Sequence, residues 1–218
     1  SKSYAVMVEA ICENTDIIYE MEKKDDVLRE KNDYISSVYE KLAGDVTDQK
    51  LLFAMVANQI LEGVYFYSGF TSIYALARSG KMLGSAQMIK FIQRDEIMHL
   101  LLFQNMINSV RNERPDLFTP SNEREIYDMF DKACALEIKW GQYITQNQIM
   151  GFTDEIIEDY IKFLVDQRLI AIGLERIYNT KNPVKWVDDF SKFNDQKANF
   201  FEGKVTNYSK GSIDFDDF

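Results

Sequence analysis

The segment at residues 91–103, FIQRDEIMHLLLF, places four ionisable side chains in the middle of an apolar helix. These are Arg94, Asp95, Glu96 and His99, and apolar residues occupy positions all around the helix on either side of them. This pattern predicts a helix that is buried on most of its faces. A buried carboxylate is costly unless it is neutralised, paired or bound to a metal, so the cluster requires a specific partner.

Composition and charge limit the class of protein. The chain has 218 residues, of which 46% are apolar and 28% are charged, enough for one substantial hydrophobic core. Three prolines and ten glycines are few, and this scarcity favours long helices over a sheet with its frequent turns. The net charge of −10 and the lack of a basic stripe argue against binding to a phosphate backbone. Nucleic acid is therefore not an expected ligand.

The cysteines and the apolar runs indicate the cellular setting. Cys12 and Cys134 have neither a Cys-x-x-Cys spacing nor the density of a disulfide scaffold, which favours a reducing, cytoplasmic location. No run of about 18 apolar residues is present, so we expect no membrane span and no membrane partner. The first residues do not have the pattern of a signal peptide.

The hydrophobic pattern predicts a series of helices followed by a tail. Gly44 is expected to end one helix, and Ser121 and Thr153 are expected to cap two others. After Pro183 the helical pattern fades, and residues 203–218, GKVTNYSKGSIDFDDF, are polar and acidic, as is typical of a flexible tail. The predicted helices cover about residues 2–12, 15–23, 26–43, 47–78, 84–112, 121–149 and 153–178.

Three candidate metal ligands are expected in one layer of the fold. Glu96 and His99 form a Glu-x-x-His pair, whose side chains share one helical face because they are three residues apart. A further carboxylate, Glu62, lies in the apolar run FAMVANQILEGVYFYSGF. If the chain reverses near residue 80, Glu62 and Glu96 lie about 27 and 24 Å from the turn along two antiparallel helices, at about 1.5 Å per residue.

This group corresponds to half of a known kind of metal site. Carboxylate-bridged dinuclear sites in four-helix bundles use one Glu from each of two helices and a Glu-x-x-His pair from each of the other two. The chain contains one histidine, so it lacks a second Glu-x-x-His. Either the site holds one metal ion, or the other ligands come from another polypeptide. Carboxylate and imidazole ligands suit iron or manganese and leave positions open for dioxygen.

Several motifs resemble one known family. The segments LEGVYFYSGF and IKFIQRDEIMH resemble, in motif and in spacing, the second metal-ligand half of the small, radical-generating subunit of class I ribonucleotide reductase. The opening SKSY resembles the stretch after the family's first Glu-x-x-His, which ends in the radical tyrosine. The segment IAIGLERIYNTKNPVKW and the tail motif NYSKGSID are also similar to the family. The resemblance thus covers essentially the whole chain.

The resemblance implies a fold and a set of functional residues. The fold would be all-α, with a ferritin-like four-helix-bundle core, extra helices and a flexible C-terminal tail. Glu62, Glu96 and His99 would be ligands of a dinuclear centre of two iron ions, with manganese as the alternative. Tyr4 would carry a tyrosyl radical, and Tyr208 in the tail would take part in radical transfer.

Other residues near the ligands receive supporting roles. Asp95 belongs, by resemblance, to the long-range electron path, and its carboxylate is also expected to hold a ligand histidine as an acceptor. Arg94 would balance the buried acidic charge. Phe66, Phe70 and Ile92 lie four or eight residues from the two ligand glutamates and are expected to form an apolar pocket that shields the radical. Glu137, Trp140 and Trp186 are assigned to packing or surface positions.

The expected domains and partners follow from the same resemblance. Residues 1–190 would form the helical bundle, and residues 191–218 a flexible tail whose Phe215 and Phe218 enter a groove on the large subunit. The other partners would be a separate N-terminal fragment that supplies the remaining ligands and a second copy of the small subunit. Gene splitting, intein excision, proteolysis and trimming would each give a chain that begins at Ser1.

The leading hypothesis is the C-terminal part of a ribonucleotide reductase small subunit, active only with partner chains. One alternative is a ferritin-like oxidase or monooxygenase component that acts on a substrate beside the metals. A second alternative is a non-catalytic helical interaction protein that has lost half of its ligands. Metal content and an electron-spin signal separate the second alternative from the other two hypotheses. Dependence on a large partner separates the leading hypothesis from the first alternative.

Overall fold

The computed structural model describes residues 2–191, except for the side chains of residues 2–4, 22 and 191. Every regular element in this part of the chain is helical, which confirms the all-α class. In chain order the elements are α1 (Lys2–Ile11), α2 (Thr15–Lys24), α3 (Asp26–Glu40), α4 (Asp48–Ile60), the π-helical segment η1 (Leu61–Tyr65), α5 (Tyr67–Arg78), α6 (Leu83–Glu113), the 3-10 turn η2 (Pro115–Leu117), α7 (Pro120–Thr145), α8 (Asp154–Ala171) and α9 (Val187–Ser191).

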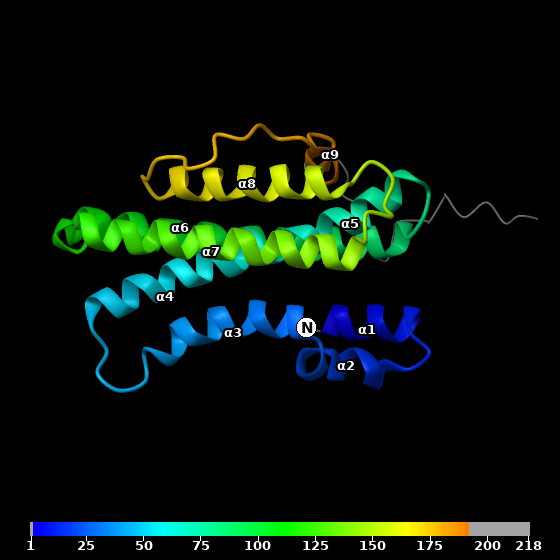
Figure 1. The fold of residues 1–218 in the computed structure, drawn as a ribbon, viewed down its shortest axis with the longest axis horizontal. Coiled ribbons are helices and arrows are strands. Elements are labelled where there is room, and N and C mark those ends of the chain that lie inside the picture. The colour runs from blue at the N-terminus through cyan, green and yellow to red at the C-terminus, as the bar shows by residue number, and fades with distance from the viewer. Residues whose placement is uncertain (1, 192–218) are drawn as a thin grey trace, which may run out of the picture.

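The bundle core consists of the run α4–η1–α5 and the three long helices α6, α7 and α8, each of which packs against that run. Figure 1 shows these elements lying along the long axis of the molecule. α3 packs against α4 and α7, and α1 packs against α2 and α6. The run α4–η1–α5 therefore lies at the centre, in contact with helices on several sides.

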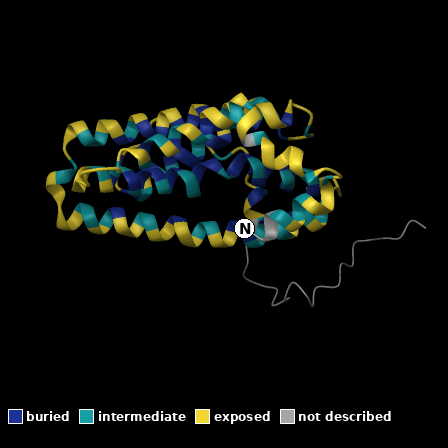
Figure 2. Ribbon diagram, turned by 90° about the horizontal axis from the view of Figure 1, so that it is seen from below, coloured by how far each residue is buried: buried dark blue, intermediate teal, exposed yellow. Residues whose placement is uncertain are grey.

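Apolar side chains from these helices meet along the bundle axis. Figure 2 shows the buried positions on the inward faces of the helices. Fully buried examples from successive elements are Leu52, Tyr74, Ile107, Phe130 and Ile161. Burial of side chains of this size stabilises the fold by about 1.5–3 kcal/mol each. Gly63, Val64 and Tyr65 of η1 are buried in this core.

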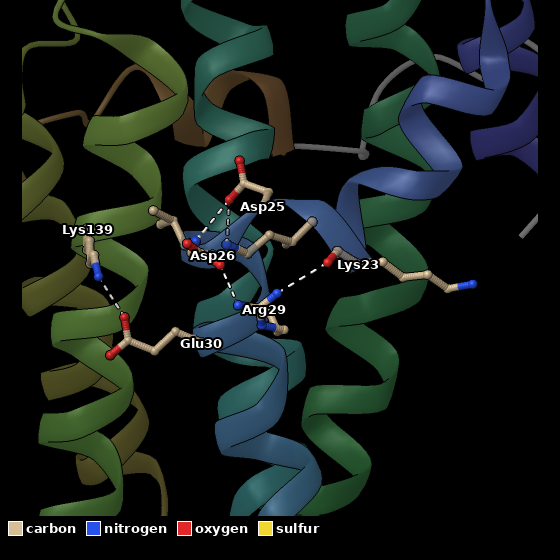
Figure 3. Close-up of polar contacts among 8 residues, drawn as sticks. Lys23, Asp25, Asp26, Arg29, Glu30 and Lys139 are labelled. Carbon is tan, nitrogen blue, oxygen red and sulfur yellow. Dashed lines mark hydrogen bonds and ion pairs between the residues drawn. The ribbon is translucent and has the colours of Figure 1, made fainter.

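The start of α3 is fixed by local hydrogen bonds and by contacts with α7. Asp25 caps α3, and its Oδ1 accepts the amides of Val27 and Leu28 at 3.0 and 2.9 Å (Figure 3). One turn further, Glu30 Oε2 accepts a hydrogen bond from Lys139 Nζ of α7 at 2.6 Å, also drawn in Figure 3. The next turn of α3 is thereby placed against α7.

Several helix ends differ from the sequence expectation. Thr119, rather than Ser121, is the N-cap of α7. The predicted end of α8 near residue 178 is wrong, because Gly173 adopts a positive φ of 78° just after Ala171 and ends the helix. α7 stops short of residue 149 because Gln146 adopts a φ of 48°. The short helix α9 was not predicted.

The largest departure is in the helix predicted over residues 47–78. Residues 61–65 form a π turn, which divides the run into α4, η1 and α5. A π turn adds one residue to the local repeat, so side chains before and after it no longer share a face at four-residue spacing. Glu62 lies inside this turn.

The remaining expectations concern the membrane and the tail. Across residues 2–191, no helix combines the length and the apolarity that crossing a bilayer requires. The tail predicted at residues 191–218 lies, from residue 192 onward, outside the described residues, and Tyr208 lies there with it.

Candidate metal centre

Glu62 of η1 meets Glu96 and His99 of α6 at one point of the fold. Each residue offers one ligand atom, and these atoms all lie within 4.8 Å of one another. His99 Nδ1 is 2.9 Å from Glu96 Oε2 and 3.8 Å from Glu62 Oε2. The proximity that the hairpin spacing predicted is therefore confirmed. Within residues 2–191, this is the group whose donors suit a metal ion.

The electrostatics of the group favour a bound cation. Burial raises the pKa of Glu62 to about 7, and the neighbouring Glu96 carboxylate adds to this rise, while His99 opposes it. The buried Oε2 of Glu62 has no hydrogen-bond partner among the described residues. Two carboxylates and one imidazole thus converge, and the Oε2 acceptor of Glu62 has no hydrogen-bond donor among the described residues. These residues fit the carboxylate and histidine ligation of an iron or manganese ion.

The group is covered on one side and open on the other. The side chains of Glu62 and Glu96 are 13% and 15% exposed, whereas that of His99 is 56% exposed. On the same helix, Met98 and Leu102 are exposed as well. The prediction that this part of α6 is buried on most faces is wrong, because no described element packs against the side that carries these residues.

Asp95 and Arg94 lie apart from the three converging side chains. The Asp95 carboxylate accepts hydrogen bonds from its neighbour Arg94 at 3.2 Å, and both side chains are exposed. His99 Nδ1 faces Glu96, and the expected role of Asp95 as the acceptor that holds a ligand histidine stays a prediction. A role for Asp95 in electron transfer stays a prediction.

The predicted apolar pocket is partly present. The rings of Phe66 and Phe70 stack with centroids 5.8 Å apart, and both line an apolar cavity of about 440 Å³. Leu61, which precedes Glu62, also lines this cavity, whereas Glu62 does not. Ile92 is buried but does not line this cavity. Tyr4 lies in the first turn of α1, and its side chain lies outside the described part.

The sequence analysis missed a buried charged pair beside η1. Glu137 is 0% exposed and Lys31 is 5% exposed, and Lys31 Nζ is 2.6 Å from Glu137 Oε2. The assignment of Glu137 to ordinary packing or surface is therefore corrected. A signal was available, since Lys31 lies between Leu28 and Ile35 on the apolar face of its helix.

The raised pKa of Glu62 predicts a pH-dependent stability of the metal-free protein. Between the ordinary pKa of 4.5 and the folded pKa of about 7, the folded state binds more protons than the unfolded state. The stability linked to this carboxyl is present below pH 4.5 and is lost as the pH rises through 7. A Glu62→Gln variant is expected to be more stable than the parent at pH 8 by about 1 kcal/mol, after a discount for solvent screening.

Denaturant unfolding in the presence of a chelator, at pH 4.5 and pH 8, measures this difference. Glu175→Gln, which changes an exposed carboxylate outside the group, is the control and should show no such gain. A Glu62→Gln variant that is no more stable than the parent at pH 8 would contradict the electrostatic account.

Known proteins match this chain along most of its length. Residues 1–183 match the family described as ribonucleotide reductase, small chain. The ribonucleoside-diphosphate reductase subunit beta of Treponema pallidum is 40% identical over 224 residues, covering 100% of this chain and 64% of that protein. The corresponding subunit of Halalkalibacterium halodurans is 37% identical, covering 98% of this chain and 63% of that protein.

A solved structure agrees with the sequence match. The ribonucleotide reductase R2 subunit from Clostridium botulinum superposes with a TM-score of 0.83 at 44% identity, covering 88% of this chain and 62% of that one. The chain thus spans less than two thirds of the length of these relatives. With the sequence match extending over the helices that hold Glu62, Glu96 and His99, the chain belongs to the ribonucleotide reductase small-chain family.

Proposed function

We propose that this chain is the C-terminal part of a ribonucleotide reductase small subunit, an oxidoreductase component of the cytoplasm. In this proposal the subunit generates and stores a tyrosyl radical on Tyr4 at a dinuclear metal centre. A large catalytic subunit then uses the radical to reduce ribonucleotides to deoxyribonucleotides. The convergence of Glu62, Glu96 and His99 within 4.8 Å is the observation that most supports the proposal.

Each of the three side chains has a distinct part in holding the metal. The carboxylates of Glu62 and Glu96 are largely covered and contribute negative charge, and the imidazole of His99 contributes a nitrogen donor. A centre of two iron ions, or of manganese, held by these residues would supply, with dioxygen as the oxidant, the oxidising equivalents for a tyrosyl radical. Tyr4 belongs to α1, and the packing of α1 against α6 supports this assignment.

The remaining ligands are proposed to come from an N-terminal fragment of the small subunit on a separate polypeptide. His99 is the single histidine of the 218 residues, so a second Glu-x-x-His has to come from elsewhere. The exposed side chains of Met98 and Leu102 lie on the same helix as the half-exposed imidazole of His99. A helix of the fragment that packed against these side chains would exclude water from the metals. The complete small subunit is proposed to form a homodimer.

Native mass and metal content, measured on one sample purified from the source, test this proposal. We expect a companion polypeptide, about two metal ions per pair of chains, and a tyrosyl signal in electron paramagnetic resonance. A chain that is isolated alone and free of metal would contradict the proposal and favour a helical interaction protein. A metal-loaded protein that acts on a substrate without any large subunit would favour a ferritin-like oxidase.

Removal of residues 192–218 is expected to abolish turnover with the large subunit while leaving metal content unchanged. The deleted segment contains Tyr208 and the apolar residues proposed to bind the large subunit, whereas the three metal-ligand candidates lie in η1 and α6. Ribonucleotide reduction and metal content of the same preparation give the two readouts. A full-length Tyr208→Phe variant should bind the large subunit and still fail to turn over. Turnover that survives the deletion would disprove this role of the tail.

A further inference from the structure

Side chains from two neighbouring helices donate hydrogen bonds to main-chain carbonyls of η1. Lys31 Nζ of α3 donates to the carbonyl oxygen of Tyr65 at 2.7 Å. Arg168 Nε of α8 donates to the carbonyl oxygen of Gly63 at 3.0 Å. Glu62, the ligand candidate, directly precedes Gly63. Both contacts therefore act on the turn that carries the carboxylate.

A third helix binds the main chain just after η1. Glu137 of α7 accepts the amide of Ser68 through Oε1 at 3.1 Å. Its other oxygen, Oε2, lies 2.6 Å from Lys31 Nζ, so Lys31 and Glu137 hold each other as well as the backbone. The Lys31 ammonium also lies 4.7 Å from the centre of the Tyr65 ring. We call Lys31, Glu137 and Arg168 the clasp residues, because their side chains bond to the main chain of η1 and of the start of α5.

A π turn explains why polar side chains are needed at this point. The change of helical repeat at η1 displaces backbone carbonyls and amides from their regular partners. In a dry core, an unpaired carbonyl or amide costs free energy comparable to a lost hydrogen bond. The clasp residues supply these bonds, each from a different helix.

Stability alone does not account for the buried ion pair. Removing two charges from water costs several kcal/mol per ion, and a well-packed apolar pair of the same volume is often as stable. Lys31 and Glu137 are nevertheless almost fully buried. What an apolar pair cannot do is donate to the Tyr65 carbonyl and accept from the Ser68 amide. The bonds to the backbone are therefore the distinctive property of this pair.

The packing around Gly63 restricts η1 further. A Cβ at this position would lie 2.9 Å from Arg168 Nε and 2.9 Å from Leu100 Cδ1, closer than real contacts allow. The main chain of η1 is thus in close contact with α6 on one side and α8 on the other. Since α6 also carries Glu96 and His99, the path of η1 sets the distance between Glu62 and the other two candidates.

We propose that Lys31, Glu137 and Arg168 are positioning residues that hold the π turn in one conformation and thereby aim the Glu62 carboxylate at the metal site. The inference deepens the proposed function and rests on it. The clasp residues do not touch the metal. Their effect is to keep Glu62 within reach of the ion that Glu96 and His99 bind, so that little reorganisation is needed on binding.

A double variant, Lys31→Met with Glu137→Leu, tests the inference because it removes both charges without leaving one of them buried and unpaired. The full 218-residue chain in its native complex is titrated with Mn²⁺ under anaerobic conditions, and free Mn²⁺ is followed by electron paramagnetic resonance. The apparent Kd is expected to rise ten- to about a hundredfold, as for other residues that orient a metal ligand. Amide hydrogen exchange of residues 61–68 should become at least about tenfold faster.

Two controls separate positioning from a general loss of stability. Lys162→Met with Glu158→Gln removes an ion pair from α8 far from η1 in sequence and should leave the Kd unchanged. Phe130→Leu weakens the core within α7 and should lower the melting temperature while leaving the Kd unchanged. Arg168→Met, which removes the donor to Gly63, is expected to raise the Kd in the same direction as the double variant.

The outcomes distinguish this inference from the proposed function. If the parent protein binds Mn²⁺ and the double variant binds it with the same Kd, or if exchange at residues 61–68 is unchanged, the positioning role is overturned while the metal site stands. If the Phe130→Leu control raises the Kd as much as the double variant does, the effect is one of stability and the positioning role fails. A parent protein that binds no Mn²⁺ overturns the proposed function and this inference together.

Discussion

A His99→Ala variant is expected to lose stably bound metal, with an affinity for Mn²⁺ at least about 100-fold weaker than that of the parent. His99 contributes the one nitrogen donor of the three converging side chains. Without it, Glu62 and Glu96 remain as two neighbouring carboxylates, and the charge and hydrogen bond of His99 no longer lower the pKa of Glu62. The carboxyl of Glu62 then retains its proton more firmly, which opposes binding of a cation.

Metal content after purification and an anaerobic Mn²⁺ titration measure the effect. Asp95→Ala is the matched control, because it removes a carboxylate from the same helix that is exposed and paired with Arg94. This control should bind metal as the parent does, whatever its part in electron transfer. A His99→Ala protein that retains its metal would show that the convergence of these side chains is an ordinary polar contact.

Tyr4→Phe is expected to eliminate the tyrosyl radical and, with it, ribonucleotide reduction, while two metal ions remain bound. The proposed ligands are Glu62, Glu96 and His99, and the substitution changes none of them. Phenylalanine keeps the ring but cannot release a phenolic proton and an electron to form a stable radical. The expected loss is complete in the radical signal and at least about 100-fold in turnover.

Electron paramagnetic resonance and metal analysis on the same sample separate these two effects. Tyr19→Phe serves as the control, since Tyr19 is an exposed tyrosine on the neighbouring helix α2 and should retain the full signal. The chain has twelve tyrosines. A radical signal that persists in Tyr4→Phe would place the radical on a tyrosine other than Tyr4. Loss of metal from the variant would instead make Tyr4 part of the metal site.

Most of the helices could be predicted from the chain because their apolar periodicity is strong. The start of α8 at Thr153 followed from its capping side chain, and the end of α6 was predicted to within one residue. Helix ends that depend on a positive φ at Gly173 or Gln146 were misplaced. These ends are set by a single backbone conformation, which periodicity does not report.

The meeting of Glu62 with Glu96 and His99 could also be predicted, because helical rise and hairpin position fix the height of a residue along its helix. The solvent exposure of each side chain could not be predicted in the same way. His99 is half-exposed and Asp95 turns outward to Arg94, since the face of α6 that bears them has no described neighbour. Periodicity shows that a helix is apolar but not which of its faces is covered within one chain.

The sequence by itself determined the all-α class, the layer in which the three ligand candidates meet, and the motifs that place the chain in its family. These properties depend on residue spacing along single helices. Only the tertiary structure decided that Glu62 lies in a π turn and that Lys31, Glu137 and Arg168 bond to the backbone around it. The physical reason is that these bonds join α3, α7 and α8 to the run α4–η1–α5, and the approach of these elements is set by packing of the whole core.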